Sequence, residues 1–221
     1  MSAILTTMRE NVRLKVGGKQ GIDATLDDNL NKATLYILAT YRPQEMWDTA
    51  SFATSANKAE YVFEDSPISK TDVYAILMLR DVTKDREILR GSMRHYNRLR
   101  QDTSVSTTIG DPRRWTRLGN KLVLYSRIPD SVARTVKLTY LKRPLLMSAT
   151  QLAFPLNDEW ARPVEEYAAF LTWTDLNEPT KAQMRLQSFQ ALVSTMDKPE
   201  AIEDEAPEAS VRPYVDMSGE L

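Results

Sequence analysis

The sequence predicts an α+β fold in which strands occupy the middle of the chain and helices occupy both ends. Within 221 residues, apolar side chains show helical spacing near both termini and form short β-type runs between them. The dipeptide Gly119-Asn120 separates two such runs and predicts a tight β-hairpin. This order predicts four parts: N-terminal helices at 1–45, a central antiparallel β domain at 46–156, a C-terminal helical hairpin at 157–196 and an acidic extended tail at 197–221.

Two helices are expected in the N-terminal part. Apolar residues recur at helical spacing from Ile4 to Val16, and Gly17-Gly18 supplies the C-terminal stop. The second helix is expected to begin at Thr25, an N-cap residue followed by two aspartates whose charge favours the positive end of the helix dipole. Pro43 is expected to end it.

Short strands are expected next, at 47–52, 60–63 and 73–82. The run from Val73 to Leu79 is continuously apolar, which favours a central place in a sheet over an edge. A short helix or an irregular connection is expected from Arg94 to Arg100. A loop rich in Ser and Thr, from Thr103 to Ile109, then precedes the hairpin.

The stretch from Asp111 to Leu176 carries the clearest patterns. The hairpin strands are expected at Trp115–Leu118 and Lys121–Tyr125. A third strand is expected at Thr135–Leu141, with its alternate residues Val136, Leu138 and Tyr140 on one face.

An amphipathic helix is expected after this strand, because Trp160, Val164, Tyr167, Ala168 and Leu171 form one stripe. Pro163 fits a first turn, which places the start of this helix near Arg162. After Asn177-Glu178-Pro179 a last helix follows, with apolar residues from Ala182 to Met196, and the two helices should pack antiparallel. Trp160, Tyr167 and Leu171 are expected in the core between them.

The composition gives little support to a catalytic or metal site. The sequence has no cysteine, which excludes disulfides and thiolate chemistry, and its only histidine is His95. Gly17-Gly18-Lys19 lacks the spacing of a phosphate loop. The acid pairs Asp158-Glu159 and Glu165-Glu166 are adjacent in sequence, so we expect their side chains to point in different directions near a helix start. We therefore predict no catalytic residue, metal or cofactor, and no apolar run is long enough to span a membrane.

Charge is distributed unevenly, although the net charge of the chain is only -1. Ten Lys or Arg residues face five acids between Arg80 and Arg117, a net charge of 10 - 5 = +5. This segment could be a solvated face, could contact an acidic protein partner, or could bind the phosphates of DNA, and the sequence leaves all three open. The candidate contact residues are Arg94, Arg98, Arg100, Arg113 and Arg114.

The tail from Asp197 to Leu221 has the opposite character. It holds eight acids and two basic residues, a net charge of 2 - 8 = -6, together with three prolines and few large apolar side chains. Such a segment cannot bury enough apolar surface to fold alone. We expect it to be an assembly element that orders only on a partner protein or on a neighbouring subunit. Its candidate anchors are Ile202, Val211, Pro213, Tyr214 and Val215.

Part of the sequence resembles the head-to-tail adaptor proteins of tailed phages, which include connector, neck and tail accessory factor-like proteins. The passages that carry the resemblance are Asp111-Pro112-Arg113-Arg114-Trp115, Gly119-Asn120-Lys121-Leu122-Val123-Leu124, Ile128-Pro129-Asp130 and Leu138-Thr139-Tyr140, with Pro144 following. The resemblance implies that the N-terminal and C-terminal helix pairs form a bundle beside an inserted β-sandwich or small barrel.

The same resemblance implies a structural virion protein that is made in the host cytoplasm and located in the neck of the particle. It would form a homo-oligomeric ring, implied to be twelve-fold, below the portal. Its further partners would be tail proteins and the double-stranded DNA that passes through the ring during packaging and ejection.

Two other functions remain open from the sequence. One is a virion-associated cell-wall hydrolase that uses a pair of carboxylates. The other is a nucleic-acid-binding protein that uses the basic segment. Loss of activity on substitution of one carboxylate would favour the first, and DNA binding that falls steeply with salt would favour the second.

Overall fold

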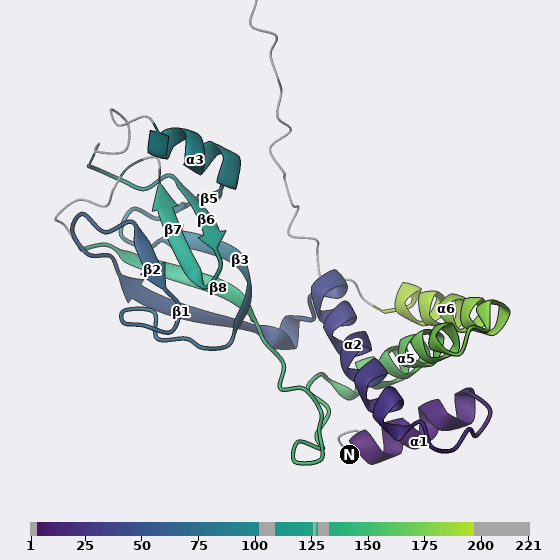
Figure 1. The fold of residues 1–221 in the computed structure, drawn as a ribbon. Coiled ribbons are helices and arrows are strands. Elements are labelled where there is room, and N and C mark those ends of the chain that lie inside the picture. The colour runs from purple at the N-terminus through teal and green to yellow at the C-terminus, as the bar shows by residue number, and fades with distance from the viewer. Residues whose placement is uncertain (1–3, 102–108, 126, 128–132, 197–221) are drawn as a thin grey trace, which may run out of the picture.

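The computed structural model describes residues 4–101, 109–125, 127 and 133–196, which form two regions in contact with each other (Figure 1). The helical region comprises α1 (Leu5–Lys15), α2 (Asp23–Tyr41), α5 (Ala161–Asp175) and α6 (Pro179–Ser194). The β region comprises two sheets and α3 (Met93–Gln101). The short 3-10 turns η1 (Gln44–Met46) and η2 (Asp158–Trp160) precede β1 and α5. The α+β class is therefore confirmed.

The first two helices follow the sequence patterns closely. Gly17 and Gly18 have positive φ angles, and the Gly18 N–H donates to the Arg13 carbonyl at 2.9 Å, so the glycines end α1 as expected. The start of α2 differs from the prediction. Thr25 is not its N-cap, because the Leu26 N–H already bonds to the Ile22 carbonyl at 2.9 Å and the helix begins at Asp23.

The helical core is built from apolar side chains of all four helices, and α5 packs against each of the other three. Buried residues include Leu5, Met8, Val12, Leu30, Ile37, Val164, Ala168, Phe189 and Val193. Figure 1 shows α5 and α6 side by side and antiparallel, as predicted. Pro163 lies in the first turn of α5, also as predicted.

The expected apolar stripe of α5 was partly wrong. Trp160 is buried, and the half-buried Tyr167 stacks on Tyr36 with ring centroids 4.2 Å apart. Leu171, however, is only half-buried and does not belong to the helical core. Because α5 contacts three helices, its buried face is wide and is centred on Val164, Ala168 and Thr172 instead.

The two sheets each contain four strands. The first has the order β1 (Trp47–Ala53), β8 (Thr135–Lys142), β3 (Val73–Asp81) and β4 (Arg86–Glu87). The second has the order β2 (Glu60–Val62), β7 (Lys121–Tyr125), β6 (Arg114–Leu118) and β5 (Leu89–Arg90). All pairings are antiparallel except that of β5 with β6, which is parallel. The core of the β region includes Phe52, Leu79, Leu122, Leu124, Val136, Leu138 and Tyr140.

The predicted hairpin is confirmed as β6 and β7, with Leu118 opposite Lys121 and Gly119 at a φ of 59°. The expected third strand is β8, and its alternate residues Val136, Leu138 and Tyr140 are all fully buried. β8 does not extend the hairpin. Instead it belongs to the other sheet, where it pairs with β1 on one side and with β3 on the other.

As expected, β3 is an inner strand of its sheet, between β8 and β4, although most of the Val73–Leu79 run is paired on one side only. β8 pairs along β3 on one side, but within the described residues β4 pairs only with Arg80 and Asp81 on the other. The apolar run has another cause. Tyr74, Ala75 and Leu77 pack against the helical core, while other residues of the strand contribute to the β core.

Polar contacts fasten both the loop that follows β8 and the start of β1 to the second helix and its C-terminal cap. The Asn31 side chain donates to the Met147 carbonyl and accepts from the Met147 N–H, both at 2.9 Å. The Trp47 indole N–H donates to the Arg42 carbonyl at 2.9 Å. Among the residues described, no helix has the length and apolar character that crossing a membrane requires.

Candidate interaction surface

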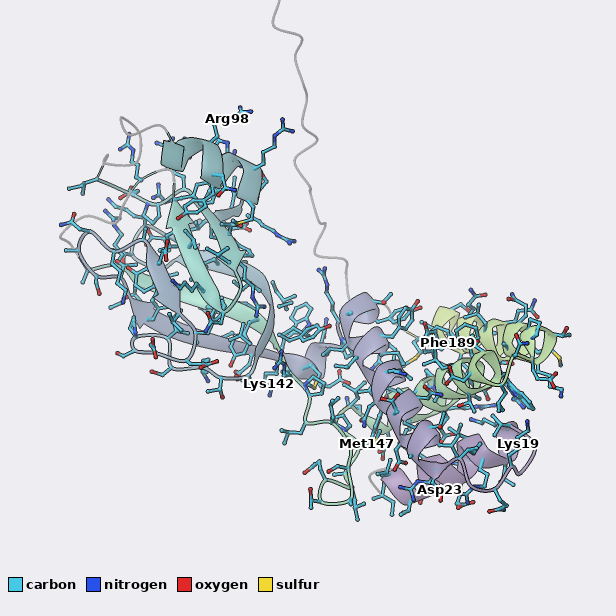
Figure 2. All side chains as sticks on the ribbon, in the orientation of Figure 1. Lys19, Asp23, Arg98, Lys142, Met147 and Phe189 are labelled. Atoms are coloured by element: carbon cyan, nitrogen blue, oxygen red, sulfur yellow. The ribbon has the colours of Figure 1, made fainter. Side chains whose placement is uncertain are left out.

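The basic surface, as we call it, consists of Arg94 and Arg98 on α3 together with Arg113 and Arg114 at the start of β6. α3 packs next to β6, so the fold brings these cations to one end of the β region. Arg94, Arg98 and Arg113 are exposed, and Arg114 is half-buried. Figure 2 shows Arg98 on the side of α3 that faces away from the sheets.

α3 forms because its sequence is amphipathic and its first turn is capped. The Ser92 hydroxyl oxygen accepts the His95 N–H at 3.1 Å, which satisfies one of the free donors at the start of the helix. Met93, Tyr96 and Leu99 lie three residues apart and are half-buried, which leaves the charged side chains on the opposite, exposed face.

A cluster of tyrosines fixes α3 on the second sheet. The Tyr96 hydroxyl donates to the Glu60 carboxylate at 3.2 Å, and its ring meets that of Tyr125 edge-on, with centroids 5.7 Å apart. A Cβ on Gly91 would lie 1.5 Å from the Tyr125 hydroxyl oxygen, so only glycine fits there. Burial raises the pKa of Tyr125, and the positive charge of Arg114 opposes that rise.

An ion cluster beneath this end holds the segment that carries Arg113. Arg134 pairs with Asp81, at 3.7 Å, and with Asp111, while Arg86 reaches Asp111 at 3.1 Å. The Arg86 guanidinium also donates to the Pro112 carbonyl at 3.4 Å. The side chain of Asp81 is fully buried, so its charge depends on these arginines for stabilisation.

Several cations of the basic segment serve the fold rather than the basic surface. Arg117 is half-buried, donates to the carbonyls of Tyr74 and Val73, and lies 5.2 Å from the centroid of the Phe63 ring. Burial lowers its pKa. Arg80 pairs with Asp85 at 2.5 Å. The basic segment is thus divided between structural arginines and the basic surface.

The remaining candidate residues lie partly or wholly outside the described part of the chain. Arg100 belongs to α3, but its side chain is not among the described ones. The five candidate anchors in the tail, Ile202, Val211, Pro213, Tyr214 and Val215, also lie outside the described residues. His95 is exposed beside Tyr125, with ring centroids 5.8 Å apart. No group of three or more potential metal ligands occurs in the ranges that the structure describes.

Sequence reasoning missed a polar network in the helical region. The adjacent carboxylates Glu165 and Glu166 do not point apart, because both contact the Lys15 ammonium, at 2.7 and 3.3 Å. Arg185 pairs with Glu166 at 3.3 Å and donates to the Lys15 carbonyl at 3.0 Å. No local signal could have found this network, since Lys15 and Glu165 are 150 residues apart in sequence.

A second polar site that was missed lies in the first sheet. The Tyr140 hydroxyl faces the carboxylates of Asp48, at 3.1 Å, and Asp72, at 3.2 Å. Burial, reinforced by the two negative charges, raises the pKa of Tyr140 strongly.

The family model described as SU10 adaptor protein matches residues 3–213 and thus spans the helical region, the β region and most of the tail. The chain belongs to the SU10 adaptor protein family. Membership confirms the resemblance found at the hairpin and shows that the protein is a phage adaptor protein. No curated protein gave a significant match. In this SU10 adaptor protein the matched part includes the acidic residues 197–208, the helices that precede them and α3.

Proposed function

We propose that this SU10 adaptor protein is a non-enzymatic structural protein of the virion that forms a ring below the portal, connects the capsid to the tail and lines the DNA channel. The single observation that carries the proposal is the family match over residues 3–213. The ring, its implied twelve-fold symmetry and its contacts with portal and tail proteins are parts of the proposal.

The fold suits a ring subunit. The helical and β regions have separate apolar cores and expose different surfaces, with the basic surface at the end of the β region. A ring with rotational symmetry needs two different surfaces on each copy that are complementary to one another. A rigid subunit with chemically different ends meets that requirement.

The tail is proposed to complete the contact with the portal. Its net charge of -6 and its prolines prevent it from forming a core of its own, while Pro213, Tyr214 and Val215 offer an apolar anchor. Ordering an extended segment costs about 1 to 2 kcal/mol per residue, so the partner must supply apolar pockets or positive charge.

DNA contact in this role is passive. A channel must let DNA slide during packaging and ejection, and the net charge of -1 gives the subunit no overall attraction for a polyanion. Weak and salt-sensitive binding of free DNA is therefore consistent with the proposal.

No observation favours the cell-wall hydrolase. Glycoside hydrolysis needs two carboxylates that face a sugar across an open site. Glu165 and Glu166 are buried and bound by Lys15 and Arg185, so a polysaccharide cannot reach them.

Electron microscopy of the purified chain, alone and mixed with the portal of the same phage, tests the proposal. We expect a closed ring on the portal face, and we expect capsids made without this protein to lack tails. Portal alone is the control. A chain that stays off the portal, together with normal tailed particles in its absence, would refute the assignment.

A further inference from the structure

We propose that the exposed face of α3 binds the acidic segment 197–208 of a neighbouring copy, an inference that rests on the proposed ring. The acidic segment holds six acids and Lys198, a net charge of 1 - 6 = -5. The contact would link the β region of one subunit to the chain end of the next. It is separate from the anchoring of Pro213, Tyr214 and Val215 on the portal.

The charge on α3 is not compensated within the described residues. Arg94 and Arg98 are four positions apart on one exposed face, and α3 contains no acidic residue. Like charges at this spacing destabilise a helix, so a nearby acidic group would be favourable. Neither arginine forms an ion pair with any residue that the structure describes. α3 therefore presents a pair of cations that an external acidic group can neutralise.

Three cations on helices of the helical region differ from this pair. Lys32 pairs with Asp28 at 2.6 Å, and Lys181 pairs with Glu178 at 3.4 Å, each within one turn of its own helix. Arg9 pairs with Asp27 of the next helix at 2.6 Å. The sequence thus supplies acids beside the cations of the helical region and omits them on α3.

The surface is also held in place before any partner arrives. Ser92 caps the helix, Tyr96 is tied to Glu60, and the close contact of Gly91 with Tyr125 fixes the approach to α3. Because the helix is already formed and anchored, it does not have to order on binding, and more of the electrostatic attraction contributes to affinity.

An acidic protein segment fits this face better than DNA does. Two exposed arginines would neutralise few phosphates of a DNA duplex. The logarithm of the DNA-binding constant falls with the logarithm of the salt concentration by a slope of about -0.9 per neutralised phosphate, so few contacts give weak binding. Each copy in a ring carries one α3 and one acidic segment, so the two are present in equal numbers. Tethered segments reach effective concentrations on the order of millimolar and would compete with DNA for the same arginines.

The neighbouring copy is the favoured source of the segment because of where the last helix ends. Met196 packs against the helical core, whereas α3 lies at the far end of the β region (Figure 1). Twelve extended residues reach about 40 Å at most. Complementary charges on two different parts of one chain are what a head-to-tail contact between copies can use to close a ring.

Cysteine cross-linking tests the contact directly, because the full-length chain has no cysteine of its own. Two separate full-length chains carry Asn97→Cys on the exposed face of α3 and Ala206→Cys in the acidic segment. Mixed and oxidised, they should form a disulfide-linked heterodimer. The matched control replaces Asn97→Cys by Thr180→Cys, an exposed position at the start of α6, and should cross-link at least about tenfold less.

Charge reversal identifies the residues responsible. Arg94→Glu with Arg98→Glu should reduce the cross-linking rate about tenfold, and adding Glu203→Lys with Asp204→Lys to the Ala206→Cys chain should restore it. The control, Lys137→Glu with Arg162→Glu, makes the same change in net charge at two exposed positions outside α3 and should have no effect. Circular dichroism of each variant shows whether the fold is retained.

Three outcomes would overturn the inference. In the first, a chain that carries both cysteines forms the disulfide only within itself, and no disulfide forms between separate chains. That result would mean that the segment binds α3 of its own subunit. Cross-linking could be insensitive to charge reversal. Alternatively, the reversal could abolish binding of a 30-base-pair duplex and leave cross-linking intact, which would assign the face to DNA. These experiments contain no portal protein. A negative result would therefore refute the contact between copies without refuting the adaptor role, which particle assembly tests separately.

Discussion

The helical and β regions handle their charges in different ways. In the helical region the buried carboxylates Glu165 and Glu166 meet Lys15 and Arg185, and exposed cations such as Lys32 have an acid one turn away. In the β region the buried cluster around Asp81 supports a surface on which Arg94 and Arg98 have no acidic partner among the described residues. The buried carboxylates of the helical region are thus neutralised within the chain, whereas the β region presents charge that a partner can use.

This difference suggests how the protein divides its tasks. Substitutions at the buried ion pairs of the helical region should change the stability of the isolated chain, because both partners of each pair belong to that chain. The basic surface should matter little for stability and strongly for assembly. Four measurements of stability test the first half of this division, from the largest expected effect to the smallest.

Phe189→Ala should give the largest loss of stability. The ring is 2% exposed and contacts Tyr36, Tyr41 and Tyr167, and it is labelled in Figure 2. We expect the free energy of unfolding to fall by about 3 to 5 kcal/mol, as measured by denaturant unfolding. Leu171→Ala is the control on the neighbouring helix. Because Leu171 is only half-buried, its loss should be roughly 1 kcal/mol, and equal losses would mean that the assigned core is wrong.

Lys15→Met should give the second-largest loss. It removes the ammonium that both Glu165 and Glu166 contact, and leaves Glu165 with only the Asn11 amide as a donor and Glu166 with Arg185. Leaving a buried charge uncompensated costs about 3 to 5 kcal/mol, so a drop of about 3 kcal/mol in the free energy of unfolding is expected. Lys32→Met, which breaks an exposed pair, should leave it nearly unchanged. An undiminished stability of Lys15→Met would show that the network adds nothing.

Gly91→Ala should disturb the basic surface while sparing the helical region. A methyl group at this position would overlap the Tyr125 hydroxyl, so Tyr125 or α3 must move. We expect a loss of about 1 to 3 kcal/mol, together with altered near-ultraviolet signals from the tyrosines. Tyr125→Phe in the same background removes the clashing oxygen and should recover part of the loss. If the losses in free energy of unfolding of the two single variants simply add up in the double variant, the contact between Gly91 and Tyr125 is absent.

The smallest effect should come from Tyr140, and only at high pH. Its pKa is raised in the folded state, so the unfolded chain loses the proton first as pH rises past the ordinary tyrosine value of about 10. The stabilising effect is therefore complete below pH 10 and declines above it by at most about 1.4 kcal/mol per pH unit. Denaturant unfolding of the wild type and Tyr140→Phe from pH 8 to 11 measures it. Parallel curves for the two proteins would exclude Tyr140 as the source.

The resemblance at the hairpin led to the correct family because its residues act locally. Gly119 takes the positive φ that its turn requires, and the alternation from Val136 to Tyr140 is read directly as a buried strand face. The proposed four-part division, the twelve-fold ring and the tail anchors stay predictions, since the described residues bear on none of them.

The sequence by itself determined the helices, the hairpin, the α+β class and the uneven distribution of charge. These depend on spacing over a few residues, because a helix or strand repeats its geometry at short range. Only the tertiary structure decided that β8 leaves the hairpin sheet, that the buried face of α5 centres on Ala168 rather than Leu171, and that Lys15 binds Glu165 across 150 residues. Such choices follow from which surfaces meet when the chain packs, and local spacing carries no information about a partner so distant in sequence.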